Sequence, residues 1–353
     1  MSATQAESVQ GDLIQILRAV TIVSPEAFAF AGRLVSAADM AAFGYPPAQG
    51  GAMGQAQANP LVGALQNHLY QYCYCVSFKN NHIDFTAPVT PDPSFVPSLS
   101  AANTSRERWD PGWQISAIIP GGQVVVQKGA LVRAVWPGEF LMHGGTGMAP
   151  GVGAPVSLYM PRESTVMQPG FYFAFGEAAG DWHDDGSLLR FYWNVKDSGA
   201  AALLGSITTQ LNRFRVPFRY KCLTAKEAYA RVDAAVLYVA KRLYRITAEL
   251  LVEVHAQIAA QLDPETPLFT KPLASGLGFA EDPGVMESFG TSRCRLLAEA
   301  IWTAFTQGVH EERARLEIVA RHFEKSGISL EAPYLNPGSQ DRYTFPTESD
   351  PSQ

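Results

Sequence analysis

Alternation of polar and apolar residues is clearest between Arg190 and Tyr238, in three short runs. In RFYWNV, every second residue is basic, phenolic or amide, and the residues between them are aromatic or aliphatic. Successive side chains of a β-strand point to opposite faces, so the polar residues share one face. PFRYKCL and RVDAAVLYV follow as further strand candidates. Together the three runs present Arg190, Tyr192, Asn194, Lys221, Arg231 and Tyr238.

Helical spacing dominates the N-terminal part of the chain. Apolar residues in DLIQILRAVTIV predict a helix over residues 12–23 that ends before Ser24–Pro25. LVGALQNHLYQYCYCV predicts a second helix, in which His68 is interpreted as a packing residue rather than a functional one. Residues 44–60 predict a mobile loop rich in Gly, Pro, Ala and Gln, and residues 86–111 predict a long irregular connection.

Strand patterns return at Trp113. WQISAII and QVVVQKG flank Gly121–Gly122 and predict a hairpin, and LVRAVWPGEFL, VSLYMPRE and GFYFAFGEA are further strand candidates. Lys128 and Arg133 lie on these strands, either on a solvated face or at the rim of a basic pocket. The glycine-rich loop 144–155 lacks the Gly-Lys-Ser/Thr end of a nucleotide P-loop and is interpreted as a lid.

The last third of the sequence is helical again. KRLYRITAELLVEVHAQIAAQL carries one apolar face. ESFGTSRCRLLAEAIWTAF predicts a helix that Ser288 or Thr291 can cap, with Arg293 and Arg295 in its first turn. Free backbone N–H groups at a helix start, with arginines beside them, favour an oxyanion or a phosphate. A further helix is expected to stop at Gly327.

The order of helices, then mixed strands, then helices predicts an α+β fold. We expect a mixed, mainly antiparallel sheet flanked by helices, with a mostly helical N-terminal subdomain. The expected division is a helical subdomain over residues 1–110, an α+β catalytic domain over residues 111–335 and a flexible tail over residues 336–353.

The composition is that of an ordinary globular protein, with 353 residues, 47% of them hydrophobic and 17% charged. A net charge of −6 argues against nucleic acid as a partner, so an anion site must be a local basic pocket. The polar N-terminus lacks a signal-peptide pattern, and no apolar run reaches membrane-spanning length. We therefore expect a cytoplasmic protein that does not bind membranes. The four cysteines fit neither a disulfide scaffold nor a zinc site, so no metal is expected: Cys73, Cys75, Cys222 and Cys294.

A series of long motifs stands in a fixed order over about residues 60–305: GWQI, VVVQKG, VWPGEF, QPGFYFAFGE, RFYWN, VPFRYKCL, ARVDAAVLYV, FTKPLASGLGFAEDPG and ESFGTSRCRLLAEA. This series resembles the HopA-type effector family. Bacterial members that are encoded with a kinase-like partner are associated with dehydration of Ser and Thr in ribosomally made peptides (RiPPs), including class V lanthipeptides and thioamitides. The resemblance implies a phosphorylated, leader-dependent precursor peptide and a kinase subunit as partners.

The order of RFYWN, YKCLT, Arg231 and VLYV is similar, more distantly, to that in the OspF/SpvC phosphothreonine lyases and in the lyase domain of class IV lanthipeptide synthetases. By that resemblance, Lys221 takes the place of the general base. Arg231 and Tyr238 take phosphate-side and support positions. The strand histidine of those lyases, their general acid, is matched here by Tyr192.

Our leading hypothesis is a lyase that eliminates phosphate from phosphoserine or phosphothreonine in a peptide, without a metal or organic cofactor. The expected catalytic residues are Lys221, Tyr192, Tyr238 and Asn194. The expected phosphate-binding residues are Arg190, Arg231, Arg293 and Arg295, the last two by their resemblance in role to the C-terminal arginines of the lyases.

Taken singly, each of these residues is better interpreted as a surface charge or a packing residue, and only their concentration favours an anionic ligand. Two other hypotheses stay open. One is a non-catalytic module that binds the phosphopeptide, its leader or the kinase. The other is an effector-like protein that acts on host targets.

Overall fold

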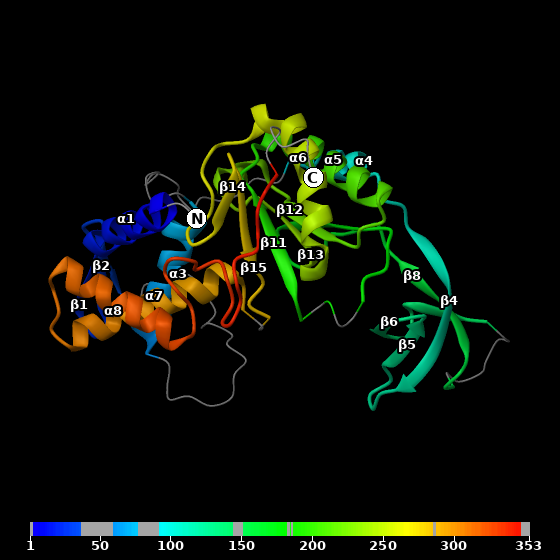
Figure 1. Ribbon diagram of the computed structural model, residues 1–353, viewed down its shortest axis with the longest axis horizontal. Helices are drawn as coiled ribbons and strands as arrows, with labels where there is room; N and C mark the ends of the chain where they lie inside the picture. Colours follow the sequence, from blue (N-terminus) through cyan, green and yellow to red (C-terminus); the bar gives the residue numbers. More distant parts are fainter. Residues whose placement is uncertain are drawn as a thin grey trace.

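The computed structural model describes residues 3–36, 59–76, 92–143, 151–181, 184, 186–284 and 287–346. Within them, helices and three antiparallel sheets form an α+β arrangement, which confirms the predicted fold class (Figure 1). The α-helices are α1 (Ala3–Ala19), α3 (Pro60–Leu69), α4 (Phe95–Ala102), α5 (Ala200–Arg213), α6 (Tyr244–Ile258), α7 (Phe289–Thr306) and α8 (Glu312–Lys325). A π-helical turn, η1 (Tyr70–Tyr74), continues α3, and short 3₁₀ turns are η3 (Asp197–Gly199), η4 (Lys226–Ala230), η5 (Lys241–Leu243) and η6 (Ala259–Gln261).

The N-terminal region differs from its prediction in two places. The predicted helix 12–23 ends at Ala19, and VTIVS forms the first strand of a small sheet because its β-branched residues favour extended backbone. The strands of this sheet are β1 (Val20–Ser24), β2 (Ala27–Phe30) and β3 (Arg33–Ser36). The predicted irregular connection 86–111 is wrong in part, since it contains α4 and the start of a long strand. Most of the predicted loop 44–60, and residues 144–150 of the predicted lid, lie outside the described residues.

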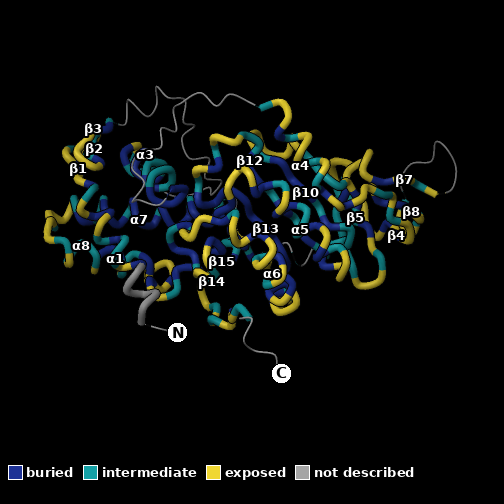
Figure 2. Tube along the Cα trace, turned by 90° about the horizontal axis from the view of Figure 1, so that it is seen from above, coloured by how far each residue is buried: buried dark blue, intermediate teal, exposed yellow. Residues whose placement is uncertain are grey.

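A seven-stranded antiparallel sheet forms the middle of the molecule, in the order β14-β15-β11-β13-β12-β10-β9. Its strands are β9 (Glu163–Ser164), β10 (Phe171–Phe175), β11 (Leu188–Trp193), β12 (Arg219–Leu223), β13 (Ala235–Ala240), β14 (Lys271–Ala274) and β15 (Leu277–Glu281). RFYWNV therefore lies at the centre of the sheet, between β13 and β15. Figure 2 shows the buried residues concentrated in this central sheet and in α7.

The two faces of the seven-stranded sheet are covered by different elements. On one face, Phe191 and Phe279 pack against Tyr244 of α6, with ring centroids 6.1 and 5.4 Å from it. On the other face, Tyr192 lies against Tyr74 of η1 and Phe289 of α7. Tyr238 of β13, on the same face as Tyr192, is 6% exposed and lines a cavity.

A five-stranded antiparallel sheet lies beside the seven-stranded one, in the order β6-β5-β4-β8-β7. Its strands are β4 (Arg108–Ile118), β5 (Val124–Lys128), β6 (Leu131–Val135), β7 (Phe140–Met142) and β8 (Pro155–Met160). The predicted hairpin around Gly121–Gly122 is confirmed as β4–β5. This sheet has its own hydrophobic core around Trp113, separate from the core that the other elements share. In Figure 1, β4 and β8 run outward from the main body to form it.

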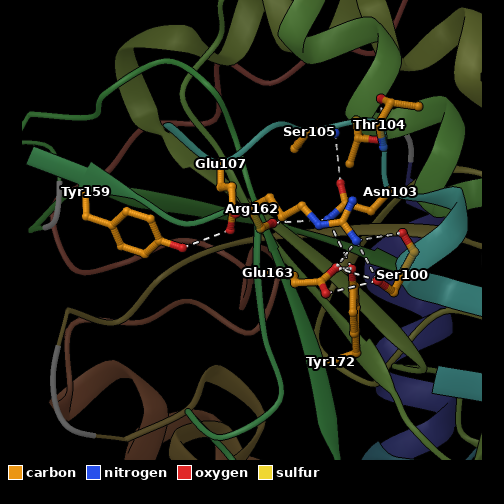
Figure 3. Close-up of polar contacts among 10 residues, drawn as sticks. Ser100, Asn103, Thr104, Ser105, Glu107, Tyr159, Arg162, Glu163 and Tyr172 are labelled. Atoms are coloured by element: carbon orange, nitrogen blue, oxygen red, sulfur yellow. Dashed lines mark hydrogen bonds and ion pairs between the residues drawn. The ribbon is translucent and has the colours of Figure 1, made fainter. Parts of the chain in front are cut away.

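A polar network fixes the junction between these two sheets (Figure 3). Glu163 accepts hydrogen bonds from Tyr172 of β10 at 2.7 Å and from Ser100 of α4 at 2.9 Å, and it pairs with Arg162 at 3.1 Å. Burial acts to raise the pKa of Glu163, but these hydrogen bonds and the Arg162 charge hold it below its usual value. Asn103 donates to the Tyr172 hydroxyl and to the Arg162 carbonyl oxygen. The chain between β8 and β10 is therefore tied to α4.

The predicted flexible tail is wrong for residues 336–346, which pack along the edge of the seven-stranded sheet. Tyr343 is buried, with its ring 4.4 Å from that of Phe279, and its hydroxyl donates to Glu281. Asp341 forms an ion pair with Lys271 of β14 at 2.7 Å. The polar composition of this segment suggested disorder, but one aromatic anchor and one carboxylate hold it in place. Residues 347–353 lie outside the described residues.

None of the helices in the described part of the chain combines the length and the apolar character needed to span a bilayer.

Candidate functional site

Antiparallel register places three side chains in one row across the seven-stranded sheet. Arg190 on β11 lies opposite Tyr238 on β13, and Tyr238 lies opposite Arg219 on β12. Lys221 is two residues further along β12, so its side chain points to the same face. We refer to Arg190, Arg219, Lys221 and Tyr238 as the cation cluster.

The Tyr238 ring is the centre of the cation cluster. The guanidinium carbons of Arg190 and Arg219 lie 5.2 and 4.7 Å from its centroid, and Lys221 Nζ lies 5.9 Å from it. Lys221 Nζ also lies 4.4 Å from the Phe171 ring. Cations within about 6 Å of an aromatic ring are attracted to its face. The aromatic rings thus offset part of the repulsion among three like charges.

Only one cation of the cluster is paired with a carboxylate of the described residues. Arg190 Nε donates to Asp282 Oδ2 at 2.6 Å, and both side chains are largely buried. Lys221 Nζ donates to the amide oxygen of Gln168 at 3.2 Å. Among the described ion pairs, none includes Lys221 or Arg219. Two unbalanced charges beside a phenol suit an anion with several oxygens, such as phosphate.

The cation cluster opens to a cavity of about 410 Å³. Arg219 and Tyr238 both line it. Cavities that hold small ligands have volumes of about 300–1,000 Å³, so this one has room for a phosphorylated side chain and part of its backbone.

Tyr192 shares the face of the cation cluster but is covered. The rings of Tyr74 and Phe289 lie 6.4 and 6.3 Å from its ring, and only 2% of the residue is exposed. Burial raises the pKa of Tyr192 to about 12, although Arg190 acts in the opposite direction. Its hydroxyl makes no hydrogen bond of good geometry within the described residues. This position does not favour Tyr192 as a proton donor to a ligand in the cavity.

Arg231 and Asn194 are occupied by other contacts. The Arg231 guanidinium makes two hydrogen bonds of 2.8 Å to the Asp233 carboxylate. The prediction that a strand opens at Arg231 is wrong, because residues 231–234 form a turn and β13 begins at Ala235. Asn194 is 5% exposed, and its Nδ2 donates to the Glu265 carbonyl oxygen at 3.1 Å. Neither side chain reaches the cation cluster through a described contact.

Ser288 caps α7 by accepting a hydrogen bond from the backbone N–H of Thr291, as one of the two predicted caps. Because the helix starts there, Arg293 lies past its first turn, not within it as predicted. Arg293 is only 1% exposed, and its Nε and Nη2 donate to the carbonyl oxygens of Pro333 and Leu335 at 2.8 and 2.9 Å. Burial lowers the pKa of Arg293 to about 10. These contacts give Arg293 a structural role, in holding the segment after α8.

Arg295 is paired with two carboxylates near the surface of α7. Its Nε lies 3.3 Å from Glu287 and its Nη1 lies 3.1 Å from Glu299. Its charge is therefore balanced locally. The structure does not bring Arg293 or Arg295 together with the cation cluster, so the predicted cradle at this helix start is not part of the same site.

The structure also shows the contacts of His68, the four cysteines and Lys128. His68 packs among Phe28, Phe30 and Tyr72, as interpreted from the sequence. The four cysteines are buried free thiols, and the described residues hold no cluster of three or more His, Cys, Asp or Glu that could bind a metal. Lys128 pairs with Asp110 at 3.0 Å.

Arg219 is the member of the cation cluster that we did not select from the sequence. It stands two residues before Lys221 in PFRYKCL, and period-two alternation puts both residues on one face. The same rule identified Arg190 and Tyr192, so the signal was present. What the sequence does not contain is the register of β12 on β13, which sets Arg219 beside Tyr238.

The fold and the cation cluster define an α+β protein with basic side chains gathered on one face of its central sheet. The HopA1 effector protein family matches residues 162–335, just under half of the chain, and this range includes the seven-stranded sheet, the cation cluster, α7 and α8. This match over residues 162–335 confirms the first resemblance seen in the sequence, that to the HopA-type effector family.

Two solved structures of effector proteins from Pseudomonas syringae are also similar. That of the effector from pathovar tomato strain DC3000 is 18% identical, with a TM-score of 0.38, and the match covers 49% of this chain and 66% of that one, just under two thirds of its length. That of the effector from pathovar syringae strain 61 is 13% identical, with a TM-score of 0.43, and the match covers 94% of this chain and 98% of that one. No curated protein sequence matches this chain significantly.

Proposed function

We propose that this protein is a lyase that removes phosphate from phosphoserine or phosphothreonine in a peptide, giving dehydroalanine or dehydrobutyrine. The observation that carries the proposal is the cation cluster, in which a lysine and two arginines surround one phenol, Tyr238, which lines a cavity together with Arg219. Guanidinium groups suit phosphate oxygens, and a lysine beside them is placed to act on the carbon that bears the α-proton.

The proposed β-elimination transfers one proton and shifts two electron pairs. A base removes the Cα proton, and the electrons of that C–H bond form the Cα=Cβ double bond. The Cβ–O bond breaks at the same time or just after, and phosphate leaves with its electron pair. Nothing is oxidised or reduced, so the reaction needs no redox cofactor.

Lys221 is the base in this proposal. It must lose its own proton before it can accept one, and neighbouring cations favour that loss while a bound phosphate opposes it. Arg219 carries no ion pair within the described residues, so its charge is available to the phosphate oxygens. Arg190 adds a second charge that Asp282 already balances in part.

Tyr238 is the proposed donor to the enolate-like oxygen that develops as the Cα proton leaves. Donors placed where charge develops in the transition state are a large source of rate enhancement. Asn194, the other candidate for this role, already donates to a backbone carbonyl oxygen. Because Tyr192 is buried, we assign the departure of phosphate to arginine contacts rather than to a tyrosine proton.

The substrate that we propose is a phosphorylated, leader-bearing precursor peptide of the lanthipeptide or thioamitide type. Its kinase is the proposed partner subunit, and the cytoplasm is the proposed location. The match of residues 162–335 to the HopA1 effector protein family supports this context.

Mass spectrometry of a leader-bearing phosphothreonine peptide, incubated with the purified protein without metal or nucleotide, tests the reaction. Loss of phosphoric acid from the peptide is the expected result. Loss only after the kinase is added would mean that the site is completed by assembly. An unchanged peptide in both cases would overturn the lyase assignment.

A second candidate function is binding of the phosphopeptide without chemistry. The observation that favours it is Tyr192, which stands where the phosphothreonine lyases carry a histidine and is buried under Tyr74 and Phe289. Phosphate-dependent binding of a peptide that stays intact on the wild-type protein would decide for this candidate.

A further inference from the structure

The cavity beside the cation cluster lies between the two larger sheets. Arg219 and Tyr238 line it from the seven-stranded sheet, and Arg133 of β6 with Tyr159 and Met160 of β8 line it from the five-stranded sheet. The five-stranded sheet is therefore the second wall of the space into which the cation cluster opens, although its hydrophobic core is separate.

The acidic groups of the cavity are engaged in protein contacts. Asp184 pairs with Arg242 at 2.8 Å, and Glu139 accepts the backbone N–H of Trp136 at 2.7 Å. Asp181 also lines the cavity and has its own electrostatic interaction, with Arg242. No described ion pair joins Glu139 or Asp184 to Arg133 or Arg219.

Arg133 and Arg219 are the two arginines that line the cavity. Both are half-buried, and the ion pairs and hydrogen bonds of the described residues include neither guanidinium. A half-buried guanidinium without a partner keeps its donors available to a ligand. Two of them on opposite walls of one cavity can approach the same phosphate group.

We propose that Arg133 supplies the second arginine of the phosphate subsite, opposite Arg219. The peptide on either side of the phosphorylated residue then lies between the two sheets, along the apolar lining formed by Leu158, Met160 and Phe175. This inference rests on the proposed function in one respect, that the ligand is a phosphorylated peptide. From the sequence, Arg133 lies either on a solvated face or at the rim of a basic pocket. Its place in the cavity lining corresponds to the rim.

The polar network in Figure 3 supports a fixed distance between the walls. Pro161 lines the cavity, and the next two residues, Arg162 and Glu163, are bound to Ser100 and Tyr172. Tyr172 belongs to β10, in the same sheet as the cation cluster. The wall that carries Arg133 is therefore anchored to the sheet that carries Arg219, and little ordering is needed when a ligand arrives.

Binding of a phosphothreonine peptide, measured by isothermal titration calorimetry, tests the subsite. The Lys221→Ala background keeps the ligand intact during the titration. Arg133→Gln and Arg219→Gln are each compared with Arg321→Gln, which removes an exposed charge on α8. We expect Kd to rise at least about tenfold for the first two and to stay unchanged for the third, because hydrogen bonds to a charged group are lost. The unphosphorylated peptide should show no such difference.

Arg133→Lys keeps the charge without the fork of donors, so an intermediate Kd is expected, and this variant serves if Arg133→Gln fails to fold. An unchanged Kd in folded Arg133→Gln overturns the inference, as does binding that does not depend on the phosphate. Elimination is assayed separately in the protein with Lys221 intact. Phosphate-dependent binding that requires Arg133, with no elimination, would support the phosphate subsite and contradict the lyase function. Elimination with an unaltered KM in Arg133→Gln would support the lyase and overturn the subsite.

Discussion

Two ends of one sheet face carry similar residues in different surroundings. The open end is the cation cluster, where Arg219 and Tyr238 line a cavity and Lys221 Nζ lies 5.9 Å from the Tyr238 ring. The closed end holds Tyr192, which lies under η1 and α7, and the buried Arg293 belongs to α7 itself. Strand alternation assigns residues to a face in the same way at both ends. What separates them is the cover, which comes from η1 and α7, two elements that are distant from Tyr192 along the chain.

The difference shows that a buried arginine and an available one serve opposite purposes. Arg293 gives its donors to two backbone carbonyl oxygens and stabilises the fold. Arg219 has no such partner in the described part of the chain, and this leaves it for a ligand. Substitutions at the closed end should therefore lower stability, and substitutions at the open end should lower activity.

The largest effect is expected at the open end, from Lys221→Ala. Loss of a positioned base should lower the elimination rate by about 10²–10⁴-fold, with the unfolding midpoint nearly unchanged. The rate is read by mass spectrometry and the midpoint by circular dichroism. Lys196→Ala is the matched control, since Lys196 is an exposed lysine just after β11. Full activity in Lys221→Ala would remove Lys221 from the proposed mechanism.

At the closed end, Arg293→Met should lower the free energy of unfolding by about 2–5 kcal/mol, because two buried carbonyl oxygens lose a charged donor. Arg219→Met should change it little. Urea unfolding of both variants measures the contrast. If Arg293→Met kept full stability but lost phosphopeptide binding, Arg293 would belong to the ligand site after all.

Low pH should lower the stability of the region that covers the closed end, through protonation of His68. His68 lies in the last turn of α3, the helix that η1 continues. Burial and, to a smaller extent, Arg33 lower the pKa of His68 to about 4. In the unfolded chain His68 takes up a proton near pH 6.5, whereas in the folded chain it does so only near pH 4. The contribution of His68 to the free energy of unfolding is therefore full above pH 6.5 and is lost as the pH falls towards 4. The loss reaches at most about 3 kcal/mol. His68→Phe should flatten the dependence of thermal stability on pH between these values, and an unaltered slope would assign it to other groups.

The smallest effect is expected from Tyr192→Phe. The Tyr192 hydroxyl is buried without a hydrogen bond of good geometry in the described residues, so its removal should change stability by less than about 1 kcal/mol. Elimination should proceed at nearly the wild-type rate. A drop of a hundredfold or more in rate, with unchanged stability, would identify Tyr192 as the general acid that its strand position suggests.

The sequence predicted the elements of the sheet better than their surroundings. Period-two alternation in RFYWNV correctly placed Arg190 and Tyr192 on one face, and the pattern around Ser288 predicted the start of α7. Alternation says nothing of the pairing between strands distant in sequence, so the row from Arg190 through Tyr238 to Arg219 could not be read from it.

Burial was the second limit. Arg231 and Arg293 look alike in sequence to any phosphate-binding arginine, yet each finds its partners inside the protein. In the N-terminal region, VTIVS continued the apolar spacing of the preceding helix, and only its β-branched residues indicated a strand. Helical spacing and β-branched composition thus predict different structures for the same residues, and the pairing of β1 with β2 favours the strand.

The segment from Pro333 to Tyr343 has a consequence for the order of events during synthesis. It supplies the carbonyl oxygens that Arg293 needs, a hydrogen-bond donor to Glu281 and the partner of Lys271. A ribosome makes it after every strand of the sheet that it contacts. Until it emerges, the Arg293 guanidinium lacks its two carbonyl acceptors, and Glu281 has its ion pair with Lys241 but not its hydrogen bond from Tyr343. The sheet edge is therefore expected to reach its final packing only in the last stage of translation.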